Sequence, residues 1–149
     1  ISSLLLGIAA LSSGAQSEKF LGRTTQQGAA RELARTVAAD GPKLASQLEL
    51  AEHASEIGVV LAGRSPEAVA LAFALGDSSV RQRVRQWEEQ ISRIELEITG
   101  DDLLAEGAEP GPDLGAALAN ALAAKRDGVI NGRSAELEFA LQSLQGQPR

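Results

Sequence analysis

The 149-residue sequence contains no cysteine and one histidine, His53. Without thiols the chain can form neither disulfides nor thiolate zinc sites, and it has no cysteine nucleophile. A single imidazole is too little for a histidine-based metal cluster. Because His53 stands among Glu49, Glu52 and Glu56, we expect it on a helix surface in a salt-bridged position.

Aromatic residues are scarce as well, at 3%, although hydrophobic residues as a whole reach 44%. The core must therefore be aliphatic, and the dominance of alanine and leucine favours helices over strands. Glycine and proline divide the sequence into short helical segments with no alternating strand pattern. The sequence predicts an all-α fold: a bundle of short helices (the body, residues 1–94) followed by a helical-hairpin tail (residues 95–149). An extended connector near Ile94–Thr99 separates them.

The N-terminal apolar run Leu4–Leu11 follows no basic residue and is too short to span a bilayer. Because the first residue is Ile1, we expect an N-terminally truncated fragment of a larger cytoplasmic protein that makes no membrane contact. Gly14 is expected to end the first helix, and Thr24-Thr25 to cap the second.

Local signals predict several helix boundaries in the body. Asp40-Gly41 is expected to close one helix and Pro42 to open the next. Ser65-Pro66-Glu67 indicates a helix start, with Gly76 as a left-handed stop. Asp77 or Ser78 should cap the following helix.

That helix carries an apolar stripe. Val80, Val84, Trp87, Ile91 and Ile94 recur at intervals of four, three, four and three residues, which places them on one face. The stripe predicts that Trp87 is a core anchor and not a base-stacking residue.

The tail begins with a short helix that starts at Thr99–Asp102 and ends at Gly107, followed by a Pro-Gly turn. Asp101 and Asp102 are interpreted as first-turn acids and not as a metal-binding pair. A longer helix runs from Pro112 to Asp127-Gly128, with Gly115 allowing close approach of the two helices. Ser134 is expected to cap the last helix. The residues that define this hairpin are Gly100, Asp101, Asp102, Leu103, Gly107, Pro110, Gly111, Pro112 and Gly115.

The net charge of −6 argues against tight, charge-driven binding of nucleic acid by the whole chain. Seven acidic residues and no basic one lie between Glu95 and Asp113. Intrahelical pairing with Glu88 or Glu89 is the alternative role for Arg85. Basic residues on either side of the acidic stretch are the candidate phosphate contacts: Arg81, Arg83, Arg85 and Arg93 before it, and Lys125, Arg126 and Arg133 after it.

Three tail segments, I-T-G-D-D-L (98–103), G-A-E-P-G-P-D-L-G-A-A-L (107–118) and D-G-V-I-N (127–131), resemble in order and spacing the tail of bacterial CCA-adding tRNA nucleotidyltransferases and poly(A) polymerases. Upstream, residues 65–77 and 80–90 are similar to the helical body of that family. The resemblance implies a role in tRNA 3′-end processing, in which C and A, or A alone, are added from nucleoside triphosphates with magnesium. The family's catalytic head motifs are not in this sequence. The resemblance therefore implies an inactive part with no catalytic residue and no cofactor of its own. Its partners would be the missing head and the acceptor stem and elbow of tRNA.

Two other functions remain open. Helix-hairpin-helix modules of DNA-binding proteins use a similar Pro-Gly turn to present backbone N–H groups to phosphate. Here Pro112 removes one donor, and Glu106, Glu109 and Asp113 surround the turn with negative charge. The other alternative is a purely structural helical domain that serves as an interface for a partner.

Overall fold

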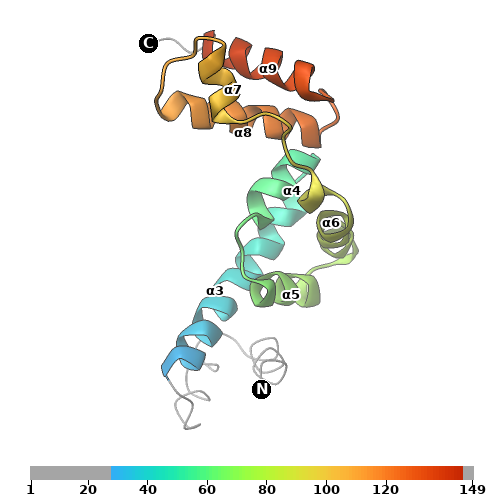
Figure 1. Ribbon diagram of the computed structural model, residues 1–149. Coiled ribbons are helices and arrows are strands. Elements are labelled where there is room, and N and C mark those ends of the chain that lie inside the picture. Colours follow the sequence, from blue (N-terminus) through green and yellow to red (C-terminus); the bar gives the residue numbers. More distant parts are fainter. Residues whose placement is uncertain (1–27, 146–149) are drawn as a thin grey trace. The chain divides into compact units, whose positions relative to one another are not determined.

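The predicted all-α fold is confirmed. The computed structural model describes the backbone of residues 28–145 and the side chains of residues 36–145. Within these residues the regular structure is entirely helical (Figure 1). The helix end expected at Gly14 and the cap expected at Thr24-Thr25 lie outside the described residues. The elements are α3 (Gly28–Leu50), α4 (Ala54–Leu61), α5 (Pro66–Leu75), α6 (Ser78–Glu89), the 3-10 turn η1 (Ile91–Arg93), α7 (Gly100–Ala105), α8 (Pro112–Arg126) and α9 (Arg133–Gln145).

The chain forms two compact units. Among the described residues, unit 1 comprises 28–51 and 60–86, and unit 2 comprises 52–59 and 87–145. The division falls inside α4 and α6, so each of these helices contributes residues to both units. The expected division into residues 1–94 and 95–149 stays a prediction.

Unit 1 is built on the packing of α5 against α3. The expectation that Asp40-Gly41 ends one helix and Pro42 opens another is wrong, because α3 continues through Pro42 to Leu50. Gly41 explains the difference: a Cβ atom added to it would stand 2.6 Å from Cγ of Leu71 in α5. The glycine therefore permits close helix packing, and Leu44 is fully buried one turn later. Burial of this face outweighs the backbone hydrogen bond that the proline removes.

The boundaries of α5 and α6 agree with the sequence in part. The side chain of Ser65 accepts a hydrogen bond from Ala68 N at the start of α5, as expected. Gly76, however, has φ −72° and is not left-handed. An added Cβ there would meet the side chain of Val80, so the glycine is needed for space. The cap of α6 is Asp77, whose Oδ1 accepts from Val80 N at 2.9 Å.

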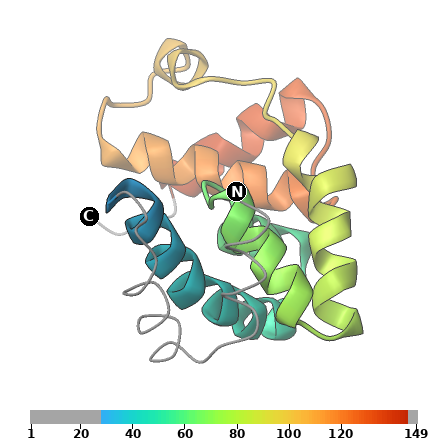
Figure 2. The ribbon, with the colours of Figure 1, turned by 90° about the horizontal axis from the view of Figure 1, so that it is seen from below.

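Unit 2 places α8 and α9 side by side, as Figure 1 and Figure 2 show, and α7 also packs on both helices. Leu103 of α7 is completely buried. Gly107 has φ +91°, a conformation that glycine adopts without strain, and α8 begins at Pro112. The buried side chains of this core are Ile98, Leu103, Leu114, Ala117, Ala121 and Ala140.

Two expectations about the tail are wrong. Gly115 does not serve close helix packing, because it is exposed and no heavy atom lies within 4 Å of an added Cβ. Ser134 is not a cap, because α9 already begins at Arg133. The residue before the helix is Gly132, with φ +82°, and its carbonyl accepts from Glu136 N. A glycine that can take positive φ ends the loop two residues earlier than a serine cap at residue 134 would.

Candidate functional site

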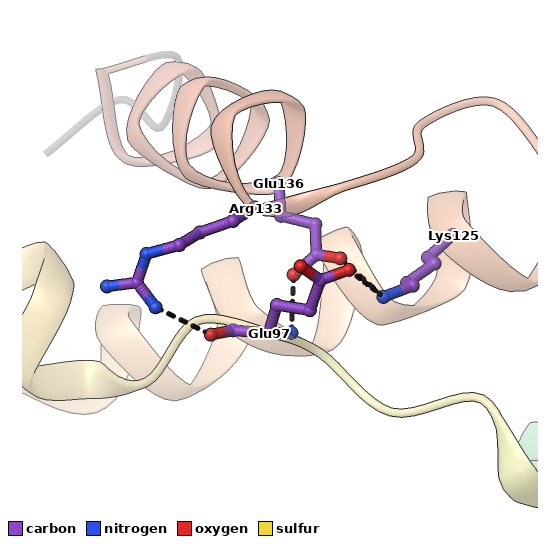
Figure 3. Close-up of polar contacts among 4 residues, drawn as sticks. All are labelled: Glu97, Lys125, Arg133 and Glu136. Atoms are coloured by element: carbon purple, nitrogen blue, oxygen red, sulfur yellow. Dashed lines mark hydrogen bonds and ion pairs between the residues drawn. The ribbon is translucent and has the colours of Figure 1, made fainter.

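Four of the seven candidate RNA-contacting side chains lie in unit 2, and three of these, Lys125, Arg126 and Arg133, have an intramolecular partner. Lys125 is in the last turn of α8. Its Nζ lies 2.6 Å from Oε1 of Glu136 and 3.4 Å from Oε1 of Glu97 (Figure 3). The side chain of Lys125 is 15% exposed. Lys125 is therefore largely neutralised within the fold.

Glu136 is the only charged residue among those described that is fully buried. Burial acts to raise its pKa, but hydrogen bonds from Lys125 Nζ and Glu97 N outweigh that effect and leave the pKa below its ordinary value. The hydrogen bond to Glu136 in turn raises the pKa of Lys125. Each partner favours the charged form of the other, so the pair is ionised at neutral pH.

Arg133, three residues before Glu136, holds the same stretch of chain from the other side. Its Nη1 donates to the carbonyl oxygen of Glu97 at 2.8 Å, and its Nη2 lies 2.6 Å from Oδ1 of Asp102. Asp102 also accepts from Thr99 N at 2.7 Å in a capping box. This hydrogen bond is the main cause of the lowered pKa of Asp102. The interpretation of Asp102 as a first-turn cap is thus confirmed.

These contacts form what we call the connector clasp: Glu97, Asp102, Lys125, Arg133 and Glu136. In Figure 3 the backbone of Glu97 lies between the two α9 side chains, with its N–H bonded to Glu136 and its carbonyl to Arg133. Ile98, the next residue, is buried in the core of the tail. The clasp therefore fastens the connector to the tail and satisfies its backbone groups.

The clasp predicts a loss of stability in acid. The pKa values of Glu136 and Asp102 lie below their ordinary values of 4.5 and 3.8 in the folded chain. Each carboxylate therefore stabilises the fold above its unfolded-state pKa, and this contribution is lost as pH falls through the folded-state pKa. We expect the urea midpoint, followed by circular dichroism, to drop between pH 5 and 3. The urea midpoint of the Glu136→Gln variant should fall less over that pH range. An equal fall in the variant and the wild-type chain would contradict the titration of Glu136.

Arg126, the third of the partnered basic residues in unit 2, packs against an aromatic ring and is only partly exposed. Its guanidinium carbon lies 5.5 Å from the centroid of the Trp87 ring, a cation–π distance. An added Cβ on Gly58 would meet the same guanidinium. Burial lowers the pKa of Arg126.

Trp87 itself is half-buried near the end of α6 and is covered by Arg126. Val80, Val84 and Ile91 of the same apolar stripe are fully buried.

His53 also differs from expectation. It is exposed, but it precedes α4 and does not lie on a helix surface. Its backbone N–H donates to Oε2 of Glu56 at 3.1 Å, and the same oxygen accepts from Glu52 N at 2.6 Å. Glu56, the third residue of the helix, thus caps the start of α4 with its carboxylate.

The four arginines of the first group do not form one cluster. Arg81 and Arg85, one helical turn apart in α6, both contact Phe73 of α5. Arg83 lies on the other side of the helix, half-buried, and donates to Ser79 Oγ at 3.0 Å. Arg93 is exposed in η1, which belongs to unit 2. Only Arg81 and Arg85 are brought together.

Phe73 was not among the candidates from the sequence. Its carbonyl accepts from Arg81 Nε at 3.2 Å, and its ring centroid lies 5.6 Å from the guanidinium carbon of Arg85. It belongs to a helix that is apolar almost throughout, so the sequence offers no reason to separate it from the core residues around it. Its half-exposed position beside two arginines is visible only in the structure.

Charge is divided unevenly between the two units. Among residues 28–145, unit 1 contains seven basic and five acidic residues, whereas unit 2 contains four basic and fourteen acidic residues. Three of these four basic residues in unit 2 are the internally bound Lys125, Arg126 and Arg133. Unit 2 is therefore the less favourable of the two units for the approach of a polyanion.

The glycines and prolines of the hairpin lie in open surroundings. Around Gly100, Gly107 and Gly111 an added Cβ would meet no atom within 4 Å, and Pro110 and Pro112 are exposed. Among residues 36–145 no three histidine or carboxylate side chains are grouped as metal ligands would be. No helix in the described part of the chain combines the length and apolarity needed to cross a membrane.

Comparison with protein-family models, with curated proteins and with solved structures found no match.

Proposed function

We propose that the chain is a non-catalytic, RNA-binding part of a tRNA nucleotidyltransferase-like or poly(A) polymerase-like protein of the cytoplasm. The tail motifs at residues 98–131 support the family. The observation that carries the RNA-binding role is the charge division, because only unit 1 has an excess of basic residues. Its exposed pair, Arg81 and Arg85, supplies the phosphate contacts.

In this proposal the tail is a scaffold. Its cations are bound within the connector clasp or against Trp87, and its acidic residues disfavour phosphate near the Pro-Gly turn. Magnesium and nucleoside triphosphates would act in the catalytic head of the parent protein. The chain alone then incorporates no labelled ATP or CTP into tRNA.

A pair of single substitutions tests where RNA binds. Arg85→Gln and Arg93→Gln remove the same charge from exposed side chains in different units. We expect Arg85→Gln to weaken tRNA binding by about fivefold at low salt and to reduce the slope of log affinity against log salt by about 1. Arg93→Gln should change affinity less than twofold. Filter binding with tRNA and a single strand of equal length is the measurement.

The result also separates the alternatives. No preference of the wild-type chain for tRNA over the single strand would contradict RNA gripping by shape. Preference for duplex DNA that is lost on Gly111→Leu would favour a helix-hairpin-helix element. No binding to any nucleic acid would favour the structural interface domain, a function that the internal use of Lys125, Arg126 and Arg133 also fits.

A further inference from the structure

We infer that Phe73 is a positioning residue that holds Arg81 and Arg85 as a pair for one stretch of RNA phosphodiester backbone. The inference rests on the proposed function and adds to it a residue without charge. Phe73, in the last turn of α5, and the two arginines, in the first two turns of α6, all lie in unit 1.

One residue fixes both guanidinium groups by different means. The backbone carbonyl of Phe73 accepts from Nε of Arg81 at 3.2 Å, and the ring of Phe73 lies 5.6 Å from the guanidinium carbon of Arg85. Because the two arginines are four residues apart in α6, their side chains leave the helix on the same face. The contacts with Phe73 therefore bring two positive charges to the same edge of the unit.

These contacts leave most hydrogen-bond donors for a ligand. An arginine has five N–H donors in a planar fork, which suits the oxygens of a phosphate. Arg81 uses its Nε toward the carbonyl. Arg85 contacts Phe73 through the face of its guanidinium and donates no hydrogen bond to any other side chain or carbonyl among residues 36–145. The side chains of Arg81 and Arg85 are both exposed. A long side chain that is already held loses less conformational freedom on binding, so the aromatic contact favours affinity without adding charge.

RNA is favoured over a small phosphate because the pair lies on an open surface. Two neighbouring guanidinium groups on a helix can contact successive phosphates of a strand, and such contacts bind backbone without reading sequence. Arg83, on the other side of α6 and bonded to Ser79, is not part of this pair. It provides a matched control with the same charge on the same helix.

The test is a double-mutant cycle on the full chain, with fluorescence anisotropy of labelled tRNA at low salt. Phe73→Leu keeps an apolar side chain and the carbonyl but removes the ring. We expect it to weaken binding about threefold or more, Phe73→Tyr to remain within twofold of the wild-type chain, and Arg83→Gln to lose less than Arg85→Gln. Phe73→Leu with Arg85→Gln should bind no more weakly than Arg85→Gln alone, because both remove one contact.

Losses that multiply in the double variant, or wild-type affinity in Phe73→Leu, would overturn the inference while leaving the proposed function in place. Absence of tRNA binding by the wild-type chain would instead overturn the proposed function, and this inference with it.

A measurement without RNA checks the geometry of the contact between Phe73 and Arg85. The NMR resonance of the Arg85 Nε proton should be shifted by the Phe73 ring and should return toward that of Arg83 in Phe73→Leu. An unchanged resonance would contradict the contact, and thermal unfolding of each variant monitors the fold.

Discussion

Replacing Gly41 by alanine is expected to lower the free energy of unfolding by about 1–3 kcal/mol. The same replacement at Gly115 should raise it by roughly 0.5–1 kcal/mol. Both glycines lie inside helices, where propensity alone favours alanine. At Gly41 the added Cβ would stand 2.6 Å from Cγ and Cδ2 of Leu71 and 2.9 Å from its Cβ, so the Leu71 side chain or the backbones of α3 and α5 must shift. At Gly115 it would meet nothing.

Urea unfolding followed by circular dichroism measures both changes, and each variant is the control for the other. The sign difference is the decisive feature, because helix propensity contributes equally to the two substitutions. Stabilisation by Gly41→Ala would contradict the close packing of α5 on α3. Destabilisation by Gly115→Ala would restore the expectation that the tail hairpin needs a glycine there.

Replacing Glu136 by alanine is expected to lower the free energy of unfolding of unit 2 by about 3 kcal/mol. Glu136 is fully buried and accepts from Lys125 Nζ at 2.6 Å and from Glu97 N at 2.7 Å. The substitution leaves the amine of Lys125 and the N–H of Glu97 without that partner, and it creates a small cavity beside the connector.

Glu136→Gln separates charge from hydrogen bonding. The amide keeps the size of the side chain and an oxygen that can accept from Glu97 N, so its cost should be smaller, about 1–2 kcal/mol. Hydrogen exchange at the amide of Glu97 gives a local measure, since protection there should fall in Glu136→Ala more than in Glu136→Gln. Unchanged protection and stability in both variants would contradict the connector clasp.

Much of the helical architecture could be predicted from local signals. Ser65-Pro66 and Asp77 mark helix starts through a capping side chain, and such marks depend on a few adjacent residues only. The errors have a common cause. Gly41 and Pro42 read locally as a break, yet α3 continues because Leu71 packs against the glycine. The roles expected of Gly76 and Gly115 also depended on how the chain packs: Gly76 makes room for Val80 at the start of α6, and Gly115 faces open space.

The candidate site shows the same division. The sequence identified all seven basic residues of the candidate site, but it could not show which of them pair with other residues of the chain. Glu136 lies 39 residues from Glu97 and 11 from Lys125, and no local pattern marks it as their partner. Phe73 was hidden for the same reason. The acidic stretch from Glu95 to Asp113 is visible in the sequence, but only the structure shows that it belongs to unit 2.

The most direct test of the central claim is a titration of the ¹⁵N-labelled chain with unlabelled tRNA, followed by backbone amide chemical shifts. If unit 1 carries the phosphate contacts, the first and largest changes will occur between Phe73 and Gln86, with those of α8 and α9 near zero. Largest changes in residues 112–145 would contradict the account, because they would place RNA on the acidic unit whose cations are bound within the fold.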